Sequence, residues 1–262
     1  MALTHINFFS DALVRCVSCD VILPQLRGGR PGDEKFKTLY LLHGSSDDET
    51  IWQRRTSIER YVSAYGLAVV MPAVSLSSYA DMAHGARYYT YISSELPRLM
   101  RTFFPLSEKR EDNFIAGLSM GGAGALKIGL ANPDKYAAIC CLSAGAYGMY
   151  MGENDDPRFR EKKRMLYEGR KLADTEEDVF GNASRACEAG RLLPRIYHSC
   201  GSEDFLLENA HKTRDFFQAF PDNHFDYKYE EDPGSHTWEY WDEHIRRFLD
   251  YLKLEPDRRF ML

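Results

Sequence analysis

The segment Asn113-Phe-Ile-Ala-Gly-Leu-Ser-Met-Gly-Gly122 constrains the fold of this chain more than any other feature. It contains the pattern G-x-S-x-G, with an apolar run before the serine and a stretch rich in alanine, glycine and leucine after it. In this context the pattern predicts a sharp turn from a strand into a helix, which lifts the hydroxyl of Ser119 away from the backbone. The N–H groups of the first helical turn also favour negative charge there. The segment therefore predicts that Ser119 is a nucleophile for acyl transfer.

Apolar runs alternate with helix-like stretches along the rest of the chain, which predicts a mostly parallel sheet covered by helices on both faces. The predicted strands are Arg15–Leu23, Thr38–Leu42, Leu67–Met71, Asn113–Ala116, Ala137–Leu142, Arg195–Cys200 and Phe225–Tyr229. The predicted helices are Ser57–Tyr65, Tyr88–Phe103, Gly122–Ala131, Leu207–Phe220 and Thr237–Leu252. This order indicates one domain with the α/β-hydrolase fold, and it disfavours the alternative that the turn at Ser119 only packs a helix on a strand.

Two connecting segments do not fit this alternation of strands and helices. Gln25–Lys35 is rich in glycine and predicts a surface turn between the first two predicted strands, which would then form an antiparallel pair at the sheet edge. Ala146–Leu192 is long, strongly charged and interrupted by glycines. We interpret it as an inserted cap of short helices and a candidate wall of the acyl or alcohol pocket. A solvated helical decoration is the alternative.

A serine hydroxyl needs a histidine to take its proton, and in this fold the order along the chain is serine, acid, histidine. Five histidines follow Ser119, namely His198, His211, His224, His236 and His244. His236 comes directly after the last predicted strand, at the carboxyl edge of the sheet where open α/β folds bind their ligands. The sequence therefore predicts His236 as the base, with an ordinary surface-loop histidine as the alternative.

The acid of the triad is expected on the loop after the preceding strand. Asp204 lies there, in Arg195-Ile-Tyr-His-Ser-Cys-Gly-Ser-Glu-Asp204, and can fix the imidazole tautomer. Glu203 is the neighbouring competitor, and Asp226 is less favourable because it begins the next predicted strand. A helix N-cap is the other role that Asp204 could fill.

Acyl transfer also needs N–H donors for the tetrahedral oxyanion, one from the residue after the nucleophile and one from the loop after an earlier strand. Met120 provides the first. The second is expected in His43-Gly-Ser-Ser46, which follows an apolar strand. We predict the N–H of Ser45, with that of Ser46 as a fallback.

Several motifs spread over almost the entire chain together resemble one known family. They are His43-Gly44-Ser45, Trp52, Tyr88–Pro97, Gly117-Leu-Ser-Met-Gly-Gly122, Gly201-Ser-Glu-Asp204 and Gly234-Ser-His-Thr-Trp238. The family is the esterase D group of α/β-hydrolases, and the chain is most similar to its bacterial tributyrin esterases. The motifs Gly-Leu-Ser-Met-Gly-Gly and Gly-x-His-x-Trp are fairly specific, whereas Ala146–Leu192 matches the family least.

The resemblance implies hydrolysis of acetyl, propionyl or butyryl esters through an acyl-serine, with no cofactor and no metal. Relatives include carbohydrate acetyl esterases, cinnamoyl or feruloyl esterases, and S-formylglutathione hydrolases. Trp52 corresponds to the family's tryptophan near the oxyanion loop, so Trp52 and Gly44 are expected to contact substrate. A plain core aromatic is the alternative for Trp52.

The composition of the chain limits the kinds of partner that we expect it to bind. The chain of 262 residues carries 33 Lys and Arg against 39 Asp and Glu, so its net charge of −6 disfavours nucleic acid. No basic leader and no apolar run long enough to span a bilayer are present in the sequence, which favours a cytoplasmic protein without membrane contact. Its six cysteines are expected to be reduced, and the C-x-x-C spacing of Cys16 and Cys19 lacks a second ligand pair. A homo-oligomer is compatible with these features.

Three rival functions follow from the same residues. The triad could transfer the acyl group to an alcohol instead of water, or it could hydrolyse the thioester S-formylglutathione. A third hypothesis is a binding protein that keeps the hydrolase fold without catalysis. Covalent labelling by an active-site phosphonate distinguishes an active serine from this third case.

Overall fold

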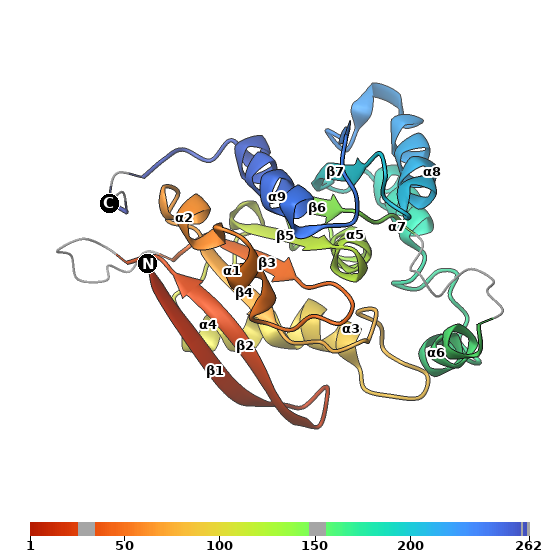
Figure 1. Ribbon diagram of the computed structural model, residues 1–262, viewed down its shortest axis with the longest axis horizontal. Helices are drawn as coiled ribbons and strands as arrows, with labels where there is room; N and C mark the ends of the chain where they lie inside the picture. Colours follow the sequence, from red (N-terminus) through yellow and green to blue (C-terminus); the bar gives the residue numbers. More distant parts are fainter. Residues whose placement is uncertain (26–34, 147–155, 258, 261–262) are drawn as a thin grey trace.

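The computed structural model describes residues 1–25, 35–146, 156–257 and 259–260, which fold as one eight-stranded sheet between two layers of helices (Figure 1). The strands are β1 (Ala2–Ser10), β2 (Arg15–Leu23), β3 (Thr38–Leu42), β4 (Ala68–Pro72), β5 (Asn113–Leu118), β6 (Ala138–Leu142), β7 (Arg195–Gly201) and β8 (Lys228–Asp232). Their order across the sheet is β1-β2-β4-β3-β5-β6-β7-β8. From β4 to β8 every neighbouring pair is parallel. The predicted α/β-hydrolase fold is confirmed.

The antiparallel edge of the sheet differs from the prediction. β2 pairs with β1 on one side and with β4 on the other, both antiparallel, so the predicted pairing of Arg15–Leu23 with Thr38–Leu42 is wrong. The strand β1 was not predicted at all, and its side chains alternate between exposed and half-buried as on an edge strand. The predicted turn Gln25–Lys35 lies mostly outside the described residues.

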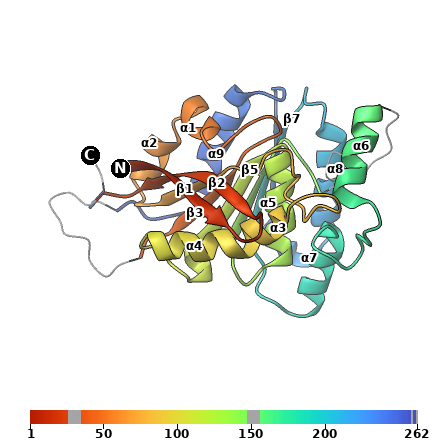
Figure 2. The same ribbon diagram turned by 90° about the horizontal axis from the view of Figure 1, so that it is seen from below.

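The helices, by their bounds, are α1 (Ile51–Arg55), α2 (Ile58–Ser63), α3 (Tyr88–Thr90), α4 (Leu96–Phe103), α5 (Met120–Ala131), α6 (Pro157–Tyr167), α7 (Val179–Glu188), α8 (Leu207–Gln218) and α9 (Trp238–Leu252), with short η segments Tyr91–Glu95, Arg110–Asp112 and Pro221–Asn223. Figure 2 shows α1, α2 and α9 on one side of the sheet and α4 and α7 on the other. Of the described helices, none combines the length and the apolar character needed to cross a membrane.

Successive side chains along each strand point to opposite faces of the sheet, so a separate hydrophobic core forms on each face. Tyr40 and Leu42 of β3 pack with α4, α5 and α7, whereas Leu39 and Leu41 pack with α1, α2 and α9. All residues of β3, β4, β5 and β6 are buried, which is the pattern of strands covered on both faces. The two cores hold the carboxyl ends of the parallel strands at one edge of the sheet.

The predicted helix Tyr88–Phe103 is interrupted by a π-helical turn over Tyr91–Glu95. Pro97 has no N–H to donate to the carbonyl of Ser93, and the ammonium of Lys135 donates to that carbonyl instead, at 2.8 Å. The carboxylate of Glu95 accepts hydrogen bonds from the hydroxyl of Ser10 and the N–H of Asp11, at 2.5 and 2.7 Å. The widened turn thus anchors the β1–β2 hairpin.

The predicted cap segment 146–192 contains α6 and α7 where it is described, and residues 147–155 lie outside the described part. α7 packs in the same core as α5. α6 docks on the loop after β4, where Ala83 and His84 donate N–H groups to the carbonyls of Leu166 and Met165 at 3.0 and 2.9 Å. These contacts join the segment to elements at the carboxyl edge of the sheet.

Candidate active site

Ser119 stands between β5 and α5 in a backbone conformation that few residues adopt. Its φ of 52° and ψ of −120° lie outside the regions ordinarily allowed to an L-residue. Its N–H donates to the carbonyl of Leu142 on β6 at 2.8 Å, which fixes the turn. A Cβ on Gly121 would overlap the carbonyl oxygens of Leu42 and His43, so only glycine allows α5 to approach β3 this closely. This is the strained strand-to-helix turn that the G-x-S-x-G pattern predicts.

His236 lies in the loop between β8 and α9. Its Nε2 is 3.0 Å from the Oγ of Ser119, within hydrogen-bond distance. Two aromatic rings flank the imidazole: the buried ring of Trp241 at 4.9 Å and the exposed ring of Phe205 at 4.5 Å between centroids. The structure therefore brings the predicted base to the predicted nucleophile across 117 positions of the chain.

Asp204 lies behind His236, in the turn after β7. Its two carboxylate oxygens are 3.0 and 2.9 Å from the Nδ1 of His236, and one of them also accepts the N–H of Leu206 at 2.9 Å. Burial alone would raise the pKa of this carboxyl, but hydrogen bonds from His236, the N–H of Leu206 and the hydroxyl of Ser143 outweigh it, so the pKa lies below its ordinary value. The ionised carboxylate accepts a hydrogen bond from Nδ1–H, which leaves the Nε2 lone pair facing Ser119.

The alternatives for the acid lie elsewhere. Glu203 is exposed, and its N–H donates to the carbonyl of Gly234 at 2.9 Å, which ties the Asp204 turn to the loop of His236. Asp226 forms an ion pair with Arg195 at 2.8 Å. Within the described residues, neither carboxylate forms a hydrogen bond or an ion pair with His236.

Three of the other histidines after Ser119 have partners outside the site. His198 is fully buried; its Nδ1 accepts from Tyr227 Oη at 2.6 Å and its Nε2 donates to the carbonyl of Ala144 at 2.9 Å. Burial lowers its pKa to about 4, so it is neutral at pH 7. His211 pairs with Glu231 at 2.6 Å, and His224 contacts the carbonyl of Pro221. They serve packing and surface contacts.

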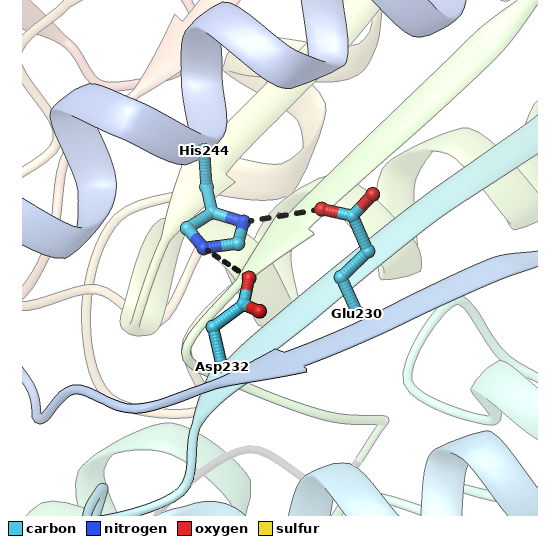
Figure 3. A group of neighbouring side chains, drawn as sticks. All are labelled: Glu230, Asp232 and His244. Carbon is cyan, nitrogen blue, oxygen red and sulfur yellow. Dashed lines mark ion pairs between the residues drawn. The ribbon is translucent and has the colours of Figure 1, made fainter.

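The fifth histidine belongs to a second group of titratable side chains, which links α9 to β8 (Figure 3). His244 lies 3.7 Å from the carboxylate of Glu230 and 3.4 Å from that of Asp232. Arg247 donates to the same two carboxylates at 3.1 and 2.5 Å. Its guanidinium already supplies the positive charge that a metal ion would bring, so we assign this group to an ion-pair network.

The loop expected to provide the second oxyanion donor lies against Ser119. A Cβ built on Gly44 would be 3.6 Å from the Cβ of Ser119, which places the His43–Ser46 turn beside the nucleophile. Ser45 is half-buried, and Ser46 is exposed with a φ of 67°. Met120 begins α5, so its N–H has no acceptor within the helix. The structure thus places the His43–Ser46 turn and the first residue of α5 beside the predicted nucleophile.

His43 holds this loop in place, a role that the sequence analysis did not assign. Its Nδ1 donates to the carbonyl of Gly44 at 2.7 Å and its Nε2 accepts the N–H of Val74 at 3.0 Å. The hydroxyl of Tyr79 donates to the carbonyl of His43 at 2.8 Å. Burial lowers the pKa of His43, in keeping with the neutral form that both contacts require. The adjacent pair His43-Gly44, directly after an apolar strand, was the sequence feature that could have indicated this role.

Trp52 does not lie where substrate contact requires. Its side chain is fully buried, its Nε1 donates to the carbonyl of Leu42 at 3.0 Å, and its ring meets that of Trp238 edge-on at 5.2 Å. We therefore correct the expectation of substrate contact: the structure gives Trp52 a packing role beneath the oxyanion loop. The alternative of a core aromatic fits these contacts.

This arrangement suits acyl transfer. A hydroxyl, an imidazole and a carboxylate are joined by hydrogen bonds, and the hydroxyl lies at a helix N-terminus beside the turn that contains Gly44. Such a site can deprotonate the hydroxyl, hold a tetrahedral oxyanion and protonate a leaving group. Each step uses atoms of the chain itself.

Comparisons with known proteins agree with this chemistry. The family model named Esterase matches residues 10–251. An acetyl esterase of Caldicellulosiruptor saccharolyticus is 30% identical over 271 residues, covering 98% of this chain and 100% of the relative.

Two solved structures from Staphylococcus aureus are similar over nearly their whole length. One is FphF, a fluorophosphonate-binding serine hydrolase with substrate bound, at 36% identity and a TM-score of 0.84, covering 96% of this chain and 98% of that one. The other is the S-formylglutathione hydrolase FrmB without ligand, at 36% identity and a TM-score of 0.81, with the same coverage of 96% and 98%.

Proposed function

This chain belongs to the Esterase family and is a carboxylesterase, and we propose that Ser119, His236 and Asp204 form its catalytic triad. The observation that carries the proposal is the position of His236. Its Nε2 lies 3.0 Å from Ser119 Oγ while its Nδ1 lies 2.9 Å from Asp204 Oδ2. An imidazole held by an ionised carboxylate and facing a strained serine is the arrangement that activates a hydroxyl.

In the proposed reaction, His236 Nε2 takes the hydroxyl proton of Ser119 as Oγ attacks the ester carbonyl. The N–H groups of Met120 and Ser45 stabilise the oxyanion, and His236 then gives its proton to the departing alcohol oxygen. Water, deprotonated by the same imidazole, then attacks the acyl carbon. The bond from that carbon to Ser119 Oγ breaks, His236 returns the proton to Oγ, and the carboxylic acid leaves. Asp204 stays ionised throughout and holds the imidazole in the productive tautomer.

We infer short acyl chains, from acetyl to butyryl, as the preferred acyl groups. The acetyl esterase of Caldicellulosiruptor saccharolyticus is 30% identical over 98% of this chain, which supports an acetyl-sized acyl group here. A panel of p-nitrophenyl esters from acetate to octanoate tests it. The value of kcat/KM is expected to peak at or below butyrate, and a maximum at octanoate would overturn the inference.

S-formylglutathione hydrolysis is the second candidate, favoured by the 36% identity to FrmB. The same triad can attack a thioester carbonyl, because only the leaving atom changes. The two candidates separate in one measurement: kcat/KM for S-formylglutathione against kcat/KM for p-nitrophenyl acetate. A preference for the thioester of a hundredfold or more would make it the function, and comparable values support the carboxylesterase.

The proposed triad is tested by Ser119→Ala, which removes the nucleophile but adds no bulk. Hydrolysis of p-nitrophenyl acetate is expected to fall at least about a thousandfold and fluorophosphonate labelling to disappear. Ser202→Ala, at an exposed serine of the Asp204 turn, is the matched control and should keep both. Labelling that persists in Ser119→Ala would place the nucleophile elsewhere, and an unlabelled wild-type protein would favour a non-catalytic binding function.

We also propose that segment 146–192 acts as a cap on the single hydrolase domain. The ammonium of Lys127 on α5 forms a buried ion pair with Glu177 at 2.9 Å, and α6 docks on the loop after β4. Both contacts support a fixed position for the described part of the segment relative to the helix that follows Ser119.

A reducing compartment such as the cytoplasm suits the thiols. All six cysteines are free; Cys16 is exposed, and Cys19, three residues on, is fully buried in β2. The two thiols of the C-x-x-C spacing therefore do not share one environment.

A further inference from the structure

Phe205 is an exposed aromatic residue in direct contact with the base of the proposed triad. Its side chain is 68% exposed, and its ring lies 4.5 Å from the imidazole of His236 at an interplanar angle of 48°. Single exposed apolar residues are common on protein surfaces and need no explanation by themselves. The contact with His236 is what distinguishes Phe205.

The turn around Phe205 is rigid, because hydrogen bonds fix the backbone on both sides. Asp204 donates its N–H to the carbonyl of Gly201 at 3.0 Å, and Leu207 donates to the carbonyl of Asp204 at 3.0 Å. The N–H of Leu206 donates to the Asp204 carboxylate at 2.9 Å. The ring therefore stands at a set place beside the imidazole rather than on a free loop.

The position of the ring determines which part of an ester it meets. During acylation, Nε2 of His236 must come within about 2.6–3.2 Å of the leaving oxygen to protonate it. The group attached to that oxygen thus extends from the imidazole, and among the described residues the rings of Phe205 and Trp241 are the two that lie against the imidazole. Trp241 is buried and donates its Nε1 proton to Ser143 at 2.8 Å, so only Phe205 offers an open face.

We propose that Phe205 is a specificity-determining residue for the alcohol half of the ester, and that its ring binds aromatic or other apolar leaving groups by stacking. The proposal rests on the triad proposed above. Stacked or edge-to-face aromatic pairs gain affinity beyond the area they bury, and an exposed ring next to the leaving oxygen supplies that gain only to alcohols that carry a flat or apolar group. A methyl or ethyl alcohol is too small to use it.

The test compares benzyl acetate with ethyl acetate in wild type and Phe205→Ala. The two esters share the acyl group and have leaving alcohols of similar acidity, so they differ mainly in the ring. In Phe205→Ala, kcat/KM for benzyl acetate is expected to fall about three- to tenfold while that for ethyl acetate stays within about twofold. The value of kcat/KM reports acylation, the step in which the alcohol leaves.

Two further variants sharpen the result. Phe205→Tyr keeps a ring at this position and should keep the preference for benzyl acetate. Phe103→Ala removes another exposed phenylalanine, at the end of α4, whose ring contacts Phe8 and Phe104, and it should leave the ratio of the two esters unchanged.

Two outcomes would overturn the proposal. An equal loss on both esters, with a shifted pH profile of kcat/KM, would mean that Phe205 only shields His236 from water. No loss on either ester would mean that the ring has no part in substrate binding. Both are distinguishable from a failure of the triad, because that failure would appear as an unlabelled wild type or as labelling that persists in Ser119→Ala.

Discussion

The carboxylate of Asp204 determines which nitrogen of His236 carries the proton. It is buried, its pKa is held below the ordinary value by the hydrogen bonds it accepts, and it faces Nδ1 at 2.9 Å. Asp204→Asn keeps the size of the side chain but offers an amide that favours the other tautomer. We expect kcat for p-nitrophenyl acetate to fall by about 10³- to 10⁴-fold with KM little changed.

Stopped-flow or steady-state kinetics on purified Asp204→Asn would measure this, with Glu203→Gln as the neighbouring control. The exposed Glu203 should tolerate the change, since its contact with the His236 loop is made by its backbone N–H. Near-normal activity in Asp204→Asn would remove Asp204 from the triad.

Trp52 provides a second test at the level of single residues, because it separates packing from substrate binding. Trp52→Phe loses the hydrogen bond to the carbonyl of Leu42 and part of the edge-on contact with Trp238. The free energy of unfolding is expected to fall by about 1–3 kcal/mol, measured by urea denaturation. KM for short esters should stay unchanged, and a selective rise of KM at unchanged stability would restore the substrate-contact hypothesis.

The residues of the site differ in how well the sequence could predict them. Ser119 and Asp204 each follow an apolar strand, and His236 follows the last predicted strand. Their common position at the carboxyl edge of a parallel sheet could therefore be predicted from the sequence. The roles of Phe205 and His43 could not be predicted from their position after a strand, because they depend on contacts of 4.5 Å with an imidazole ring and 2.7 Å with a carbonyl that only folding creates. For Trp52 the sequence left two roles open, and burial decided between them.

Among the secondary-structure elements, three of the longer helices were predicted well. α5, α8 and α9 begin and end within two residues of their predicted bounds. The last strand, predicted over 225–229, is β8 at Lys228–Asp232, because Phe225 packs into the core ahead of the strand. β1 was missed because polar residues such as His5 and Asn7 alternate with its half-buried Ile6 and Phe8, as edge strands allow.

The buried ion pair between Lys127 and Glu177 connects α5 to the predicted cap segment. Both side chains are almost fully buried, and the ammonium also donates to the carbonyl of Ser78 at 2.8 Å. Lys127→Met leaves the Glu177 carboxylate without its cation, so we expect a loss of about 3–5 kcal/mol in the free energy of unfolding. Urea denaturation of the variant measures the loss.

The double variant Lys127→Met with Glu177→Leu is the control for this prediction. Replacing both charges by apolar groups of similar size removes the unpaired carboxylate, so most of the lost stability should return. A double variant as unstable as Lys127→Met alone would show that packing around α5, rather than the unpaired charge, causes the loss.

For the molecule as a whole, the sequence predicted the class of fold but not the complete order of strands. The parallel run from β4 to β8 follows from strands that alternate with crossover helices. The strands that pair with β2 cannot be predicted in the same way, because an antiparallel strand at the edge can pair with any neighbour that its connections reach. The choice of β4 and β1 depends on packing of Val21 and Ile22 into the two cores, which local patterns do not encode.

Buried neutral histidines make the stability of the whole fold depend on pH. Burial lowers the pKa of His198 to about 4 in the folded chain, and its ordinary value in an unfolded chain is about 6.5. Between about pH 4 and pH 6.5, this histidine is therefore protonated in the unfolded state but neutral in the folded state. The stabilisation is complete above about pH 6.5 and is lost as the pH falls towards about 4.

His198 alone should account for about 2 kcal/mol of stability lost between pH 7.5 and pH 5. Urea denaturation at several pH values in this window measures the slope of the free energy of unfolding against pH. His198→Gln cannot take up the proton, so its slope near pH 5 should be smaller than that of wild type by about 1 kcal/mol per pH unit, whatever its own loss of stability at pH 7.5. The slope depends on how many protons are taken up on unfolding and not on the contacts that the substitution removes. Equal slopes for wild type and His198→Gln would therefore show that His198 is already charged in the folded state.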